Sequence, residues 1–114
     1  MRLPHNLAPQ AIRDVADAAA WFADGPGGEA LARRFARAVS AAAGRVSQRP
    51  LLGHRRLELL PDPYRFYAVR GFDYLLVYNT ARAGAPVARV VYMGRDLGPL
   101  LADLRDLPNA DEPG

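Results

Sequence analysis

Three short segments in the second half of the chain constrain its fold more than any other feature. They are rich in aromatic and β-branched residues, and only the short turns RGFD and ARAGAP separate them. Segments of this composition form strands, and turns of this length join neighbouring strands in antiparallel order. The sequence therefore predicts an antiparallel meander with strands at about Tyr64–Val69, Tyr74–Thr80 and Val87–Met93.

The predicted strands carry large apolar residues on both faces. Successive side chains of a strand point to opposite faces. The middle strand therefore places Tyr74, Leu76 and Tyr78 on one face and Leu75, Val77 and Asn79 on the other. The last strand is expected to place Val87 on the same face as Arg89, Val91 and Met93. Both faces of the sheet need a cover, because large exposed apolar patches are rare on soluble domains.

Two segments before the strands have the apolar spacing of helices. Residues 8–24 repeat apolar residues along one face, and Pro9 suits a first helical turn. Residues 29–48 repeat the pattern and carry Arg33, Arg34, Arg37 and Arg45 on the opposite face. The intervening DGPGG breaks the helical pattern, so the two helices are expected to form an antiparallel hairpin.

The remaining segments are shorter. We expect a weak edge strand in RLPHNL and a connector over Arg49–Pro63 in which LELL is a short extended piece. A last helix is expected to begin near Asp96 or Gly98, with Asp96 as its N-cap. The predicted fold is α+β: an N-terminal antiparallel helix hairpin packed on a small antiparallel sheet, with a short C-terminal helix. One domain is expected over residues 1–107, with a disordered tail at 108–114.

The helix hairpin can cover only one face of the sheet. The second face is covered either by the connector and the terminal helix or by another polypeptide. We expect a partner, because a small domain has little chain with which to cover both faces. Burying about 500 Å² of apolar surface would contribute roughly 12 kcal/mol before association costs.

Composition excludes several kinds of chemistry. The chain has no cysteine, and all of its fifteen basic residues are arginine, so neither a thiolate nor a lysine amine is available. The two histidines, His5 and His54, are too few for a metal site, and no phosphate-binding loop is present. We therefore expect no cofactor and no metal. No apolar run approaches the roughly 20 residues of a membrane span, and the first residues lack a secretory signal, so we expect a cytoplasmic protein.

The order and spacing of these segments resemble the ParE branch of the RelE/ParE toxins of type II toxin–antitoxin systems. The resemblance extends over about Leu7–Leu104. LAPQAIRDVADAAAWFAD is similar to the first helix of the family, and ALARRFARAVSAAAGRVSQRPLLG to the second, which closes with Pro50 and Gly53. YRFYAVRGFDYLLVYN resembles the central strands, and VARVVYMGRDL the last strand with its Arg-Asp closure.

The resemblance implies a plasmid-stabilization type of toxin that a small, acidic, ParD-like antitoxin neutralises. The ParE branch acts by binding DNA gyrase, without catalytic residues of its own. The RelE branch cleaves messenger RNA on the ribosome with clustered Lys, Arg, His, Glu and Tyr residues. This chain has no lysine and has Met93 where the family often has histidine, which favours the ParE branch. An mRNA interferase and a decayed toxin that only binds antitoxin are the alternatives.

Seven residues are candidates for binding a partner: Trp21, Arg65, Tyr74, Leu76, Tyr78, Arg89 and Arg95. Arg65 and Arg89 are expected in one region of the sheet, where they either bind acidic groups or pair with Glu58 or Asp73. Arg95 pairs either with Asp96 or with the target.

Three residues are weaker candidates for catalysis: Glu58, Arg65 and Tyr92. Together they would form a ribonuclease-like cluster and supply the acid and base that RNA cleavage needs. The alternative for the tyrosines is packing across strands. The run Arg33, Arg34 and Arg37 is expected to be a solvated face, with a phosphate-binding stripe as the alternative. Direct binding of nucleic acid is not expected.

Overall fold

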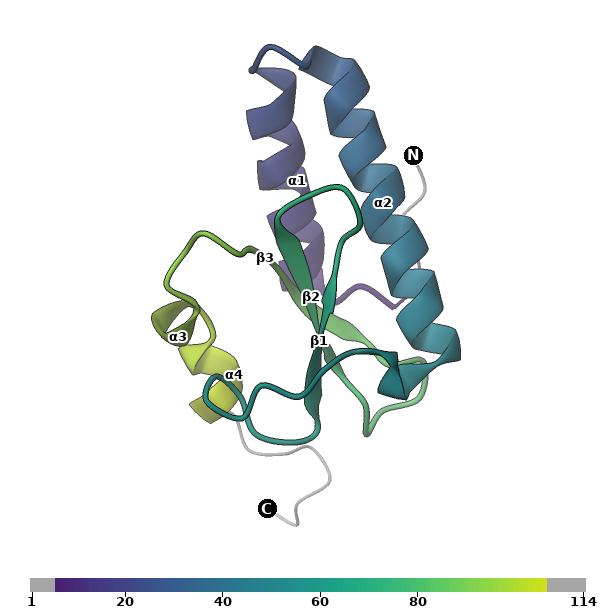
Figure 1. The fold of residues 1–114 in the computed structure, drawn as a ribbon, viewed down its shortest axis with the longest axis vertical. Helices are drawn as coiled ribbons and strands as arrows, with labels where there is room; N and C mark the ends of the chain where they lie inside the picture. Colours follow the sequence, from purple (N-terminus) through teal and green to yellow (C-terminus); the bar gives the residue numbers. More distant parts are fainter. Residues whose placement is uncertain (1–5, 107–114) are drawn as a thin grey trace.

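The computed structural model describes residues 6–106, in which a helix hairpin packs against one face of a three-stranded sheet (Figure 1). Helix α1 spans Pro9–Ala23 and helix α2 spans Gly28–Gln48, so the predicted helices are confirmed. Alanines at the buried positions of both helices let their axes approach closely, among them Ala11, Ala18 and Ala42. The predicted α+β fold class is confirmed.

The sheet is the predicted antiparallel meander. Strands β1 (Tyr64–Ala68), β2 (Tyr74–Asn79) and β3 (Val87–Tyr92) lie in the order β1-β2-β3. Within the described part of the predicted N-terminal edge strand, Leu7 forms an isolated parallel bridge to Val87. Residues 2–5 of that predicted strand, and the predicted tail at 108–114, lie outside the described residues.

A bulge in β3 corrects the predicted faces of that strand. Val77 pairs with Arg89, but the next residue of β2, Tyr78, pairs with Val87, so Ala88 has no partner of its own. One extra residue reverses the alternation of side chains. Val87 therefore lies in the core under the helices, while Val91 lies on the opposite face of the sheet, and the prediction that they share a face is wrong.

The main core lies between the helix hairpin and the sheet. It contains Phe35 and Val39 of α2 together with Leu76 and Tyr78 of β2, all of them fully buried. At one end of this core, Phe22, Phe35, Phe72 and Tyr74 form a cluster of rings whose centroids lie 4.8 to 6.1 Å apart. The cluster fixes the β1–β2 turn against both helices.

The second face of the sheet is covered by the chain itself. A second core joins Phe66, Leu75, Val77 and Val91 of the sheet to Leu60 of the connector and to Leu97 and Leu101 at the C-terminal end. Leu97 begins the short helix α3 (Leu97–Leu100), and Leu101 lies between α3 and the short helix α4 (Ala102–Asp106). The expectation that a partner must cover this face is therefore wrong. Two leucines four residues apart point to the same side of a helical turn, so a very short segment suffices.

The connector between α2 and β1 does not contain the extended piece predicted at LELL, residues 57–60. Pro50–Leu52 form a 3₁₀ turn, η1, and residues 57–59 form turns that place Leu60 in the second core. The predicted N-cap at Asp96 is confirmed, because its carboxylate accepts a hydrogen bond of 3.3 Å from the amide of Gly98. None of the helices in residues 6–106 is long and apolar enough to cross a membrane.

Candidate functional site: an aromatic groove between α1 and β3

An open groove of about 790 Å³ runs between α1 and the end of β3. We name it the aromatic groove and define it by Trp21, Phe22, Phe72, Tyr74, Tyr92 and Arg95. Helix α1 supplies Trp21 and Phe22. The turn before β2 and the start of β2 supply Phe72 and Tyr74, and the end of β3 and the turn after it supply Tyr92 and Arg95. The groove thus exists only in the folded chain, where α1 packs along β3.

The walls of the aromatic groove expose large apolar side chains. Trp21 is 69% exposed and Tyr92 is 45% exposed, and Met93, next to Tyr92, is 41% exposed. The ring of Trp21 contacts the edge of Phe22 at 5.3 Å, and the ring of Tyr92 lies 5.5 Å from that of Tyr74. Exposed aromatic groups held by rigid neighbours are typical anchors of protein interfaces.

Tyr74 forms part of the groove floor and is half-buried. Burial raises the pKa of its hydroxyl, the nearby Tyr92 raises this pKa further, and Arg95 opposes the shift. The hydroxyl therefore stays protonated at neutral pH and serves as a hydrogen-bond donor rather than as a base. Arg95 is exposed at the rim, and the ion pairs of residues 6–106 do not include it, so its predicted pair with Asp96 is not formed.

Arg89 and Asp14, which also line the groove, form a largely buried ion pair. Nε and Nη2 of Arg89 lie 2.8 and 3.1 Å from the two carboxylate oxygens of Asp14. Asp14 also accepts a bond from the amide of Val90, and Arg89 donates to the carbonyl of Leu100 at 2.9 Å. The pair thus ties α1, β3 and α3 together. Arg89 is paired, as one interpretation predicted, but with Asp14 rather than with Glu58 or Asp73.

Arg65 lies at the other edge of the sheet and fixes the connector. Its Nη1 donates to the carbonyl oxygens of Gly53 at 2.8 Å and Leu51 at 3.3 Å. Nearby, the hydroxyl of Tyr78 donates to Pro50 at 2.6 Å and accepts from the amide of Gly53 at 2.8 Å. Arg65 and Arg89 therefore lie on opposite edge strands, and the prediction that they share one region is wrong.

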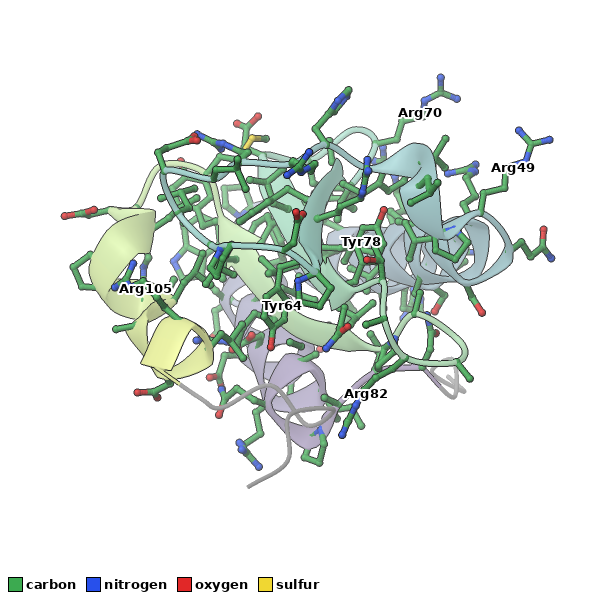
Figure 2. All side chains as sticks on the ribbon, turned by 90° about the horizontal axis from the view of Figure 1, so that it is seen from below. Arg49, Tyr64, Arg70, Tyr78, Arg82 and Arg105 are labelled. Atoms are coloured by element: carbon green, nitrogen blue, oxygen red, sulfur yellow. The ribbon has the colours of Figure 1, made fainter. Side chains whose placement is uncertain are left out.

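Two predicted partner-binding residues have no accessible surface. Leu76 and Tyr78 are 0% exposed in the main core, and Figure 2 shows Tyr78 inside the molecule. This burial corrects the prediction that they contact a partner. Burial also raises the pKa of the Tyr78 hydroxyl, while the bond from Gly53 and the charge of Arg65 oppose the shift.

The proposed ribonuclease-like cluster is not assembled. Arg65 on β1 pairs with Tyr78 of β2, whereas Tyr92 on β3 pairs with Tyr74, four residues earlier in β2. The Cα atoms of Arg65 and Tyr92 are thus roughly 16 Å apart, given the ordinary spacings of strands and of residues along them. Glu58 is exposed and binds Arg56 at 3.1 Å; a backbone hydrogen bond, then Arg56, lowers its pKa. His54 forms a bridge to Phe66, and residues 6–106 contain no cluster of three potential metal ligands.

Sequence reasoning missed the site as a unit, although it named Trp21, Tyr74, Tyr92 and Arg95 one by one. The signal was the position of Trp21 on the polar side of α1 combined with Tyr92 at a strand end. The Asp14–Arg89 pair gave no local signal, because its members are 75 residues apart.

A helix hairpin on a three-stranded antiparallel sheet, with an exposed aromatic groove at one edge, defines a small α+β domain with a surface suited to another polypeptide. Residues 6–97 match the family model described as the ParE toxin of the type II toxin–antitoxin system, parDE. The match covers most of the chain, and the chain belongs to this family. A search of curated proteins found no match. The protein is therefore the toxin of a type II toxin–antitoxin system, and the family implies an antitoxin partner.

Proposed function

We propose that the protein inhibits DNA gyrase by binding it, and that a small ParD-like antitoxin neutralises it by occupying the aromatic groove. The observation that carries the second part is the exposure of Trp21 and Tyr92 over a rigid aromatic floor. Because the chain covers both faces of its own sheet, the groove replaces the sheet face as the expected binding surface.

The groove suits an apolar segment of a partner with an acidic residue opposite Arg95. Covering the two exposed rings would remove on the order of 200 Å² of apolar surface, or about 5 kcal/mol before association costs. Arg95 is an exposed cation at the rim, and a guanidinium binds a carboxylate through two parallel hydrogen bonds. Antitoxin tails that are acidic and disordered before binding meet both requirements.

The separation of Glu58, Arg65 and Tyr92 supports inhibition by binding over cleavage of messenger RNA. RNA cleavage needs an acid and a base within reach of the same phosphodiester. An mRNA interferase of the RelE branch and a decayed toxin that only binds antitoxin stay as alternatives. Assays with gyrase and with translating ribosomes distinguish them.

The first experiment measures affinity for the cognate antitoxin by calorimetry. The variant Trp21→Ala/Tyr92→Ala removes both exposed rings and is expected to weaken binding by at least about 100-fold, because anchors of this kind contribute 2 kcal/mol or more each. The matched control, Leu51→Ala/Leu57→Ala, removes two leucines that are 70% and 59% exposed elsewhere. Equal losses in the two variants would contradict the groove as the antitoxin site.

The second experiment adds the purified toxin to gyrase and, separately, to translating ribosomes. We expect loss of supercoiling activity with intact message. Message cleavage that Arg65→Ala abolishes would instead identify an interferase. Expression without toxicity, together with antitoxin binding, would identify a decayed toxin.

A further inference from the structure

The outer face of α2 carries a row of arginines. Arg33, Arg34, Arg37 and Arg45 lie within a sector of about 120° around the helix axis, and Arg49 follows directly after the end of α2; we name these five the arginine row. All five are exposed, and Figure 2 shows Arg49 extending away from the molecule just after the end of α2. A rise of about 1.5 Å per residue makes the part of the row on α2, from Arg33 to Arg45, roughly 18 Å long.

Helix α2 alone accounts for the net charge of the protein. Helix α2 contains four arginines and one glutamate, which is a net +3, equal to the formal charge of the whole chain. The rest of the chain has eleven arginines and eleven acidic residues and is neutral. The positive charge is therefore concentrated on one helix rather than spread over the surface.

The row is not neutralised within the described part of the chain. The ion pairs of residues 6–106 join Arg55 to Asp62, Arg56 to Glu58 and Arg89 to Asp14. Like charges three or four residues apart destabilise a helix by about 0.2–0.5 kcal/mol per pair. A polyanion bound along α2 would remove this repulsion, so the row favours a ligand with regularly spaced negative charges.

The residues between the arginines indicate which polyanion. The exposed side chains beside the row are small or polar, such as Ala30, Ala41 and Gln48, and the aromatic residue of α2, Phe35, is fully buried. Protein partners need apolar anchors, which this protein has in the aromatic groove instead. Single-stranded nucleic acids need aromatic rings on which bases stack. A straight duplex needs only cations along a rod.

We propose that α2 binds the sugar–phosphate backbone of duplex DNA through the arginine row. Guanidinium groups bind phosphate oxygens through paired hydrogen bonds. Contacts of this kind carry no sequence information. This inference revises the expectation that direct binding of nucleic acid is absent, and it does not depend on gyrase as the target, because naked DNA is the ligand.

The test is fluorescence anisotropy of a labelled duplex DNA over a series of salt concentrations. For five neutralised phosphates, the slope of log K against log salt is expected near −4.5. The variant Arg33→Gln/Arg37→Gln/Arg45→Gln is expected to bind at least about tenfold more weakly and to reduce the magnitude of the slope by about 3. The control Arg55→Gln/Arg56→Gln/Arg82→Gln removes the same charge elsewhere and is expected to lose less than about threefold.

Unfolding does not explain the expected loss, because glutamine is a good helix former and the substitutions relieve repulsion. The midpoint of thermal unfolding of the row variant should equal or exceed that of the unaltered protein. Equal weakening in the two variants, or binding that is independent of salt, would overturn the inference. Tighter binding to duplex RNA or to single strands than to duplex DNA would overturn the assignment of the ligand.

Discussion

Tyr78 fixes the connector between α2 and β1 from inside the core. Its hydroxyl holds Pro50 and Gly53, and a Cβ on Gly53 would lie only 2.6 Å from that hydroxyl. We expect Tyr78→Phe to lower the free energy of unfolding by about 1–3 kcal/mol, because a buried amide and carbonyl lose their partner. Urea denaturation measures this change. A loss below about 0.5 kcal/mol would show that the connector does not need the hydroxyl.

The raised pKa of Tyr78 makes stability fall at alkaline pH. A tyrosine in the unfolded chain loses its proton near pH 10, and in the folded protein it does so at a higher pH. Stability from this group is therefore complete below about pH 10 and is lost as pH rises through the folded-state pKa. Tyr78→Phe should be less stable at neutral pH but lose less stability above pH 10, with the slope that remains due to Tyr74. Equal slopes in the two proteins would contradict this assignment.

Asp14 is the second residue whose contacts join distant parts of the chain. We expect Asp14→Asn to lower the free energy of unfolding by about 2–4 kcal/mol, because it leaves the largely buried Arg89 without a counter-charge. The side chains of Arg89 and Asp14 are only 15% and 9% exposed. Asp17→Asn, an exposed position one turn later in α1, is the control and should change stability by less than about 0.5 kcal/mol. A similar loss in both variants would mean that net charge, not the pair, is responsible.

At the scale of elements, the helices and strands followed from periodicity, and their ends lie within one or two residues of the predicted ones. The bulge at Ala88 could not be predicted from the sequence, because an alanine in a strand does not indicate a bulge. Only the pairing of β2 with β3 reveals it. The segments that cover the second face of the sheet could not be predicted from the sequence either. Whether Leu97 and Leu101 reach the sheet depends on where a short turn ends, which is a property of the folded chain.

The short C-terminal helices are expected to contribute strongly to stability despite their length. Leu101→Ala removes a fully buried side chain from the second core and should lower the free energy of unfolding by about 2–5 kcal/mol. Leu57→Ala, at a position that is 59% exposed, is the control and should change it little. Denaturation of both variants measures the difference. A small effect at Leu101 would indicate that these helices are not docked on the sheet in solution.

At the scale of the whole molecule, the aromatic groove and the arginine row share no residue. Antitoxin and duplex DNA are therefore expected to bind the toxin together rather than in competition. Anisotropy of labelled DNA with the Trp21→Ala/Tyr92→Ala toxin should equal that with the unaltered toxin. Antitoxin affinity should depend on salt much less than DNA affinity, because burial of rings is not screened. The two surfaces would overlap if the groove variant bound DNA more weakly and the variant of the arginine row bound antitoxin more weakly.

The Asp14–Arg89 pair reaches from the groove to the carbonyl of Leu100, and Leu100 itself lines the groove. An antitoxin bound in the aromatic groove is therefore expected to contact α3 as well as Trp21. The amides of Leu104 and Arg105, which bond back to Leu101, should then exchange with deuterium more slowly. The rate of deuterium exchange in that segment therefore measures antitoxin binding at a distance from the groove, without an assay of toxicity.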